Sequence, residues 1–121
     1  MKIRTHKYAE LAYPLVNDIK GASVEAKYRT LALTFPSMIM QSGLAQAIGF
    51  LMAKNKEEHK ALLEHIAKIL NYVDNGRGNP GALHQAILSS SVTKYQLLSR
   101  EALDASAWLK RYTQALLEKQ S

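Results

Sequence analysis

Histidine is the residue type best suited to binding a metal in this chain, because cysteine is absent. A metal site on a helix needs spacings such as His-Glu-x-x-His or Glu-x-x-His, which bring the ligands to one face. Neither spacing occurs around the histidines, which are His6, His59, His65 and His84. His59 falls on a helical stripe with apolar residues such as Leu63, where a core histidine is the simpler interpretation. We therefore expect no metal site and no cofactor.

Serine and glycine clusters give no stronger sign of catalysis. Ser89-Ser90-Ser91 lies in a polar turn without the elbow motif of a nucleophilic serine, so a helix cap is the simpler interpretation. Gly76-Arg77-Gly78 neither follows an apolar strand nor ends in Gly-Lys-Ser/Thr, so it does not predict a phosphate-binding loop. Arg77 on an exposed loop is still able to touch a phosphate. We expect that the protein is not an enzyme and has no small-molecule substrate.

The basic residues are better candidates for a function. The formal net charge is +6 and the pI is near 9.6, which favours an anionic partner such as nucleic acid, an acidic protein or an anionic membrane. Basic side chains on helix surfaces are candidates for contacts to a phosphate backbone that do not depend on base sequence. The candidate RNA-binding residues are Lys27, Arg29, Lys54, Arg100, Lys110 and Arg111.

The sequence around these basic residues differs from one to the next. We expect Lys110 to project from the side of its helix opposite the apolar stripe, with no acidic residue one turn away. Glu25 lies one turn before Arg29 and is spaced to neutralise it. From the residues alone, solvated charges paired within their own helices are the simpler interpretation. Base readout is not expected, because the aromatic residues fall on helical core stripes and not on a sheet.

Helices must position these side chains. Apolar residues recur at helical spacing and no segment shows sustained strand alternation, which predicts an all-α compact bundle of about five to six helices. The length suits a single domain over residues 1–121. Segment 74–81 is rich in turn formers and predicts the main loop. The expected helices cover approximately residues 5–20, 24–35, 38–54, 56–73, 82–88 and 92–118.

Proline and polar residues mark the expected helix ends. Pro14 predicts a kink or a break in the first helix. Pro36 is expected to close the second helix, so that Ser37 caps the third. Ser23 and Asn55 are the expected N-caps of the second and fourth helices.

Two further packing features are expected from spacing. Gly43 and Gly49 predict that a neighbouring backbone approaches the third helix closely. Glu64 lies one turn from both Lys60 and Lys68, which predicts ion pairs along a solvated outer face.

The ends and the apolar stretches bear on where the protein works. The N-terminal segment is basic but lacks the continuous apolar core and cleavage site of a secretion signal. The most apolar stretch, residues 38–53, is too short and too interrupted by polar residues to span a bilayer. With cysteine absent as well, we expect a cytoplasmic protein with no membrane partner.

Two segments of the chain resemble one known family. The first runs from Lys27-Tyr28-Arg29 through Phe35-Pro36 and Ser42-Gly43-Leu44 into an apolar helix. The second is Ala107-Trp108-Leu109-Lys110-Arg111-Tyr112. Their residue types, order and separation are similar to those of the small subunit of the type III-B CRISPR–Cas (Cmr) RNA-guided effector complex. The chain departs from the family pattern at Leu70-Asn71-Tyr72, where a Trp-Leu pair is usual.

The resemblance implies an all-helical structural subunit with no catalysis of its own, which takes part in antiviral defence against foreign nucleic acid. The implied partners are other Cmr subunits, copies of the chain itself, the guide RNA and the target RNA. By position, Lys110 and Arg111 are the implied RNA contacts. The residues implied to define the fold are Tyr28, Pro36, Gly43, Leu44, Trp108 and Leu109.

Two alternatives stay open on the sequence. One is a helical protein–protein adaptor without RNA contact, which an apolar groove between helices would favour. The other is a metal-dependent enzyme built on a helical bundle, against which the histidine spacing argues.

Overall fold

Helices make up almost all of the structure, as the apolar spacing predicts. The computed structural model describes residues 4–118, which form six α-helices and one short β-hairpin. This confirms the expected all-α class. The elements in chain order are α1 (Arg4–Asn17), α2 (Glu25–Ser42), α3 (Leu44–Lys54), α4 (Glu57–Ile69), β1 (Val73–Asp74), β2 (Arg77–Gly78), α5 (Pro80–Leu88) and α6 (Val92–Leu116).

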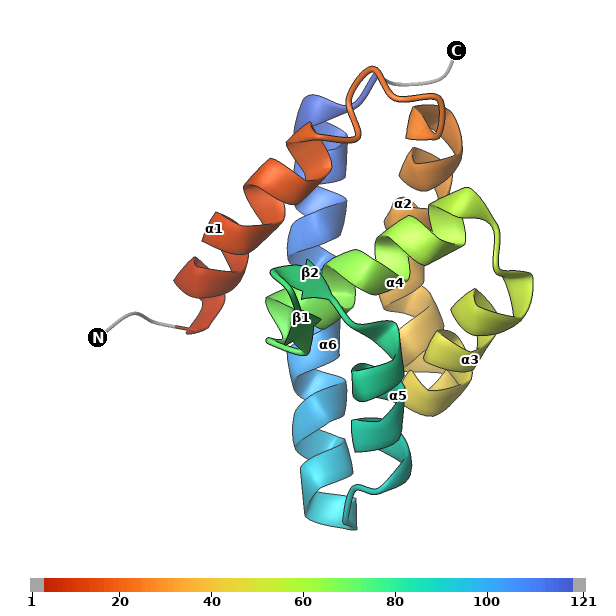
Figure 1. Cartoon of the computed structure of the whole chain (residues 1–121), viewed down its shortest axis with the longest axis vertical. Helices are drawn as coiled ribbons and strands as arrows, with labels where there is room; N and C mark the ends of the chain where they lie inside the picture. Colours follow the sequence, from red (N-terminus) through yellow and green to blue (C-terminus); the bar gives the residue numbers. More distant parts are fainter. Residues whose placement is uncertain (1–3, 119–121) are drawn as a thin grey trace.

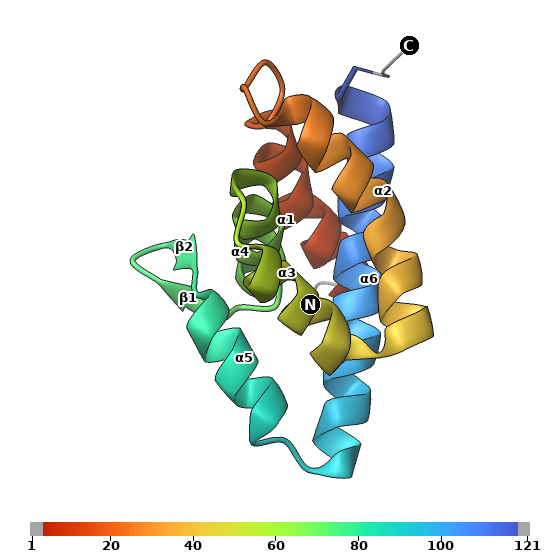
Figure 2. The same cartoon turned by 90° about the vertical axis from the view of Figure 1, so that its right-hand side faces the viewer.

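The helices α1 and α2 pack on the long C-terminal helix α6. Both α1 and α2 lie against α6, and α4 contacts α1, α2, α3 and α6. Figure 1 shows α6 running along most of the length of the molecule, and the short helix α5 contacts α3 and α4. In the view turned by 90°, α2 lies alongside α6 and the hairpin projects on the opposite side (Figure 2).

One apolar core joins these helices. Each fully buried large side chain contributes to it, and truncating such a side chain to alanine costs about 2–5 kcal/mol. The largest fully buried side chains are Val16, Tyr28, Phe35, Leu44, Ile48, Leu51, Leu62, Ile66, Ile69, Leu83, Leu98 and Leu109.

None of the helices in residues 4–118 combines the length and the apolarity that a bilayer crossing requires.

The first helix continues through Pro14, so a break at that residue does not occur. Pro14 is exposed, and α1 extends to Asn17. The helix ends before the predicted Lys20, and Gly21 adopts a φ of +81° in the turn that follows. Leu11 and Leu15 are only half-buried. The buried positions are Tyr8, Ala12, Val16 and Ile19.

The second helix also continues through its proline. The predicted end of α2 at Pro36 and the predicted cap at Ser37 are therefore wrong, because α2 runs to Ser42. Phe35 and Ile39 flank Pro36 along the buried face, and their burial opposes the cost of an interior proline, about 3 kcal/mol. The break comes at Gly43, whose φ of +87° favours glycine.

The cap predicted at the start of α2 is wrong as well. Ser23 lies in the turn before the helix, and α2 begins at Glu25 with Val24 in the N-cap position and no side-chain cap.

The two glycines expected to admit a neighbouring backbone do not do so. A Cβ atom on Gly49 would meet nothing within 4 Å, and one on Gly43 would meet only the Tyr95 hydroxyl oxygen, at 3.6 Å. The close approach lies at Gly78 in β2 instead, where a Cβ atom would collide with the main-chain carbonyl of Glu64 on α4. The hairpin therefore packs directly on the backbone of α4.

The junction between α3 and α4 corrects a third predicted cap. Asn55 adopts the left-handed conformation (φ 52°) at the C-terminal end of α3, so it does not cap the next helix. Helix α4 begins at Glu57 without a side-chain cap and ends at Ile69, before the predicted Val73. Val73 opens the hairpin, in which it pairs with Gly78.

Side chains cap α5, α6 and α3. Asn79 Oδ1 accepts a hydrogen bond from the Ala82 N–H at the start of α5 (3.2 Å), and Ser91 Oγ accepts one from the Lys94 N–H at the start of α6 (3.2 Å). The predicted serine cap is thereby confirmed. The Tyr95 hydroxyl oxygen accepts a hydrogen bond from the Ala45 N–H (2.9 Å), which supplies α3 with the cap that glycine has no side chain to provide.

Candidate nucleic-acid interface

Helix α6 carries three of the six candidate residues. Arg100 and Arg111 are both exposed and lie about 16 Å apart along the helix, since each residue adds about 1.5 Å. Arg111 lines a small hollow of about 140 Å³ together with Ala107 and Trp108. Lys110 is half-buried, so the prediction that it projects away from the core is wrong. Arg111 is consequently the better placed of the Lys110–Arg111 pair to meet a phosphate.

Aromatic rings next to Arg111 hold α1 against α6. Trp108 and Tyr112 stack with their ring centroids 5.6 Å apart, and Tyr13 of α1 meets Tyr112 edge-on at 5.4 Å. Such pairs contribute about 0.5–1.5 kcal/mol beyond area burial. The aromatic residues had been expected on core stripes, but the Tyr13 side chain is exposed.

Helix α2 carries Lys27 and Arg29. Lys27 is exposed, whereas Arg29 is half-buried and its Nε atom is buried without a hydrogen-bond partner in residues 4–118. The expected neutralisation of Arg29 by Glu25 is wrong, because the carboxylate of Glu25 binds the turn before α2 and the residue Glu118 beyond α6. It accepts hydrogen bonds from the N–H groups of Gly21 and Glu118, each 3.0 Å long. The bond from Glu118, followed by that from Gly21, lowers the pKa of Glu25 below its ordinary value.

Lys54 lies at the end of α3. Its side chain is exposed, and its Nζ atom lies 5.8 Å from the centroid of the Phe50 ring. This cation–π contact orients the ammonium group while leaving it open to solvent. The six candidates therefore spread over α2, α3 and α6 and form no single tight cluster, an arrangement suited to several separate phosphate contacts.

Arg77 and Glu64 show a contact that helical spacing did not predict. Arg77 Nε donates a hydrogen bond to Glu64 Oε1 over 3.0 Å, from β2 to α4. The predicted pairs of Glu64 with Lys60 and Lys68 are replaced by this one. Arg77 is thus engaged within the fold and is less available to a phosphate.

The histidines on α4 belong to the core. His59 is buried, which confirms its predicted place on the apolar stripe, and its ring meets Phe50 edge-on at 5.5 Å. His65 Nδ1 shares a hydrogen bond with the Tyr28 hydroxyl (2.7 Å). Burial, with Lys68 nearby, lowers the pKa of His65 to about 4, and burial raises the pKa of Tyr28. Within residues 4–118, no three histidine or acidic side chains come together as a metal site.

One feature near Lys27 was missed on the sequence. Glu58 and His59 are adjacent, buried and polar at the start of α4, and both line a groove together with Lys27. The only signal in the sequence was an acidic residue next to a histidine on an apolar stripe. Helical periodicity assigns such an acidic residue to the surface.

The architecture and the surface define a small all-helical domain with exposed cations on several helices. Residues 4–116 match the family described as CRISPR-associated protein (Cas_Cmr5), and the chain belongs to this family. The resemblance noted in the sequence is thereby confirmed.

Two relatives extend this assignment. The protein described as CRISPR system Cmr subunit Cmr5, from Thermus thermophilus, is 36% identical over 118 residues, which cover 98% of this chain and 99% of the relative. The X-ray crystal structure of a CRISPR-associated Cmr5 family protein, also from Thermus thermophilus, matches with a TM-score of 0.89 and 35% identity, over 98% of this chain and 100% of that one.

Proposed function

We propose that this chain is a non-catalytic, single-domain structural subunit of the type III-B CRISPR (Cmr) ribonucleoprotein effector complex. Its partners in this proposal are the other Cmr subunits, copies of itself, the guide RNA and the target RNA. It acts in the cytoplasm, in defence against foreign nucleic acid. The observation that carries the proposal is family membership over residues 4–116, supported by a whole-length relative described as a Cmr subunit.

RNA backbone binding is the second part of the proposal. Exposed cations on α2, α3 and α6, and a net charge of +6, suit a partner with dense phosphate. A single copy offers few such contacts, so we expect weak binding by the monomer. Several copies stacked along one RNA multiply weak contacts through effective concentration.

The experiment that tests this part uses the complex assembled from the other Cmr subunits, guide RNA and this chain. We expect Arg111→Ala to weaken target RNA binding equally across RNA sequences. The dependence of log K on log salt should become shallower by about 0.7–0.9 for the lost contact. Lys110→Ala should have a smaller effect, because Lys110 is half-buried. The matched control is Lys94→Ala, an exposed lysine near the start of α6. A loss confined to some RNA sequences would contradict backbone binding.

A helical adaptor without RNA contact remains the second candidate. The observation in its favour is the partly apolar groove between α2, α3 and α4. A pulldown of the tagged chain from its native cells separates the two candidates. Recovery of Cmr subunits with a guide RNA supports the RNA-binding subunit, and recovery of protein partners without RNA supports the adaptor.

A further inference from the structure

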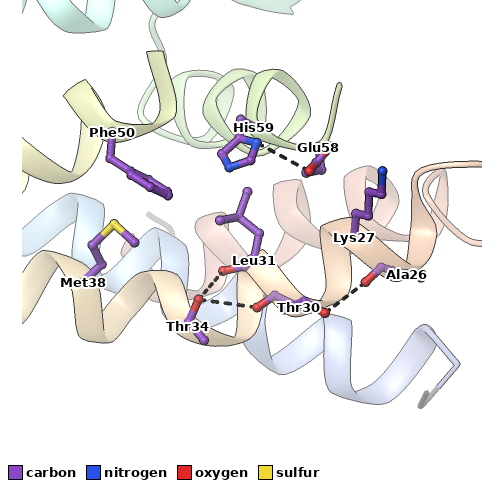
Figure 3. A pocket seen from close by; sticks show the side chains of 9 residues that line it. All are labelled: Ala26, Lys27, Thr30, Leu31, Thr34, Met38, Phe50, Glu58 and His59. Atoms are coloured by element: carbon purple, nitrogen blue, oxygen red, sulfur yellow. Dashed lines mark hydrogen bonds and ion pairs between the residues drawn. The ribbon is translucent and has the colours of Figure 1, made fainter. Parts of the chain in front are cut away.

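A groove of about 470 Å³ opens between α2 and the α3–α4 segment. Its size falls within the range of small-molecule sites, about 300–1,000 Å³. Figure 3 shows α2 forming one wall, with Phe50 and His59 facing it from the other side. The residues that line it are Ala26, Lys27, Thr30, Leu31, Thr34, Met38, Phe50, Glu58 and His59.

The carboxylate of Glu58 is the unusual group in this groove. Glu58 is only 9% exposed, yet within residues 4–118 it accepts no hydrogen bond. The nearest basic atom is His59 Nδ1, at 3.6 Å from Glu58 Oε2, which is longer than a hydrogen bond. In this groove, the fully buried polar atom without a partner is His59 Nδ1, whereas the Glu58 oxygens are not fully buried. Water can therefore reach them, and a ligand that brings N–H donors can replace that water.

Neighbouring polar atoms also present lone pairs to the groove. The hydroxyls of Thr30 and Thr34 donate to main-chain carbonyls of their own helix, at 3.2 Å from Ala26 O and 3.2 Å from Leu31 O. Each hydroxyl oxygen can still accept a hydrogen bond. The second ring nitrogen of His59 turns toward the space between Phe50 and Leu31 (Figure 3). The interior therefore favours a ligand rich in donors.

The mouth of the groove carries a positively charged side chain. Lys27 is exposed at its edge and also lines an adjoining hollow with Lys56, and Glu58 borders both spaces. Lys54 lies beyond Phe50, against its ring. The exposed ammonium group of Lys27 at this edge favours an anionic group of a ligand, such as a phosphate.

Apolar and aromatic side chains complete the site. Leu31 is buried along α2, Met38 is half-buried further along the same helix, and Phe50 is half-buried opposite them. A flat heteroaromatic ring can lie against these side chains, and stacking of a base on an aromatic ring is worth about a factor of 5 or more in affinity.

We propose that this groove binds a guanine nucleotide. Guanine carries adjacent N1–H and N2–H donors, which match the two oxygens of the Glu58 carboxylate, while the phosphate meets Lys27. The nucleotide is either free or an unpaired guanosine of RNA. Only the second source rests on the proposed function, and it adds a base contact to the backbone contacts proposed above.

The test is an NMR titration of the ¹⁵N-labelled chain with guanosine monophosphate, inosine monophosphate, adenosine monophosphate and guanosine. Guanosine monophosphate should bind most tightly. Inosine monophosphate lacks the 2-amino donor and should bind about fivefold more weakly. Guanosine lacks the phosphate and should also bind more weakly. The shifted resonances should lie around the groove, in α2 and at the start of α4.

Three variants sharpen the test. Glu58→Gln should remove the preference for guanine, with a loss of about tenfold for guanosine monophosphate. Lys27→Ala changes an exposed side chain, so it should leave the fold intact and reduce guanosine monophosphate binding to the level of guanosine. The control Lys94→Ala should leave binding unchanged. Equal binding of all the nucleotides would overturn the proposal. Tighter binding of arginine amide, whose guanidinium also offers two N–H donors to a carboxylate, would overturn it as well.

The two sources of guanine are distinguished with pentanucleotides. UUGUU binding more tightly than UUAUU and UUUUU assigns the site to RNA, whereas binding of guanosine monophosphate without any preference among the pentanucleotides assigns it to a free nucleotide. Both results support the guanine site. If the guanine preference is absent while Arg111→Ala still weakens RNA binding in the complex, this inference fails and the proposed function stands.

Discussion

The hydroxyl of Tyr28 and Nδ1 of His65 share a hydrogen bond of 2.7 Å, which joins α2 to α4. Tyr28 is fully buried, and its ring meets that of His65 at a centroid distance of 5.3 Å. When Nδ1 is the acceptor of this bond, His65 must be neutral, because a protonated imidazole has no lone pair there. The lowered pKa of His65, about 4, fits this requirement.

Acid should weaken the fold through His65. The pKa is about 4 in the folded state and 6.5 at its ordinary value, so between these limits the unfolded chain binds the extra proton. The free energy of unfolding contributed by this group is fully present above pH 6.5 and falls as the pH decreases toward 4, by about 3 kcal/mol in total. Urea titrations at about pH 7, 5.5 and 4 measure the fall. His65→Gln should reduce it, and an equal fall in the variant would assign the acid sensitivity to other groups.

Removal of the Tyr95 hydroxyl should destabilise the protein. Tyr95→Phe leaves the Ala45 N–H without its acceptor, so the free energy of unfolding should decrease by about 0.5–1.5 kcal/mol. Tyr13→Phe is the matched control, since the Tyr13 hydroxyl makes no hydrogen bond within residues 4–118 and its side chain is exposed. Thermal or urea unfolding of the two variants measures the difference. Equal stabilities would show that water replaces the tyrosine at no cost.

Two glycine substitutions should change stability in opposite directions. Gly49→Ala places a methyl group in open space within a helix, so it should stabilise the protein by up to about 1 kcal/mol. Gly78→Ala forces the hairpin away from the Glu64 carbonyl. The free energy of unfolding of the protein should therefore fall by several kcal/mol, about the scale of other core clashes. Denaturant midpoints compare both variants with the parent chain. A neutral Gly78→Ala would mean that the hairpin can move off α4 freely.

Arg29→Met should separate stability from RNA binding. The Nε atom of Arg29 is buried without a partner in residues 4–118, so replacing the guanidinium by an apolar group of similar length should keep or raise the free energy of unfolding. If Arg29 contacts RNA, as predicted from the sequence, the same variant weakens RNA binding in the assembled complex. A fall of more than about 1 kcal/mol in stability would instead assign Arg29 a structural role.

Helical spacing predicted the existence of every helix but not all of their ends. Pro36 was expected to end α2 from its local chemistry, whereas burial of Phe35 and Ile39 keeps the helix intact around it. Gly43 shows why the end comes later, because its positive φ turns the chain. Local preference predicts such boundaries poorly where tertiary packing opposes it.

Contacts between distant residues could not be predicted from spacing within a helix. Glu64 was expected to pair with lysines one turn away, but its partner Arg77 comes from the hairpin. Lys110 was placed opposite the apolar stripe, yet it is half-buried. The residue types of the candidate interface followed from the sequence and its resemblance to a family, whereas the exposure of each cation depends on how helices pack around α6.

The two long-range bonds of Tyr95 and Glu25 have a consequence for synthesis of the chain. The Ala45 N–H gains its acceptor only when Tyr95, 50 positions later, has been made. The Glu25 carboxylate accepts from the N–H of Glu118, which is made 93 positions later. Domains form as units while the ribosome releases the N-terminal part first. The first helices therefore leave the ribosome with these groups open to water, and the two bonds form only after Tyr95 and Glu118 have been released.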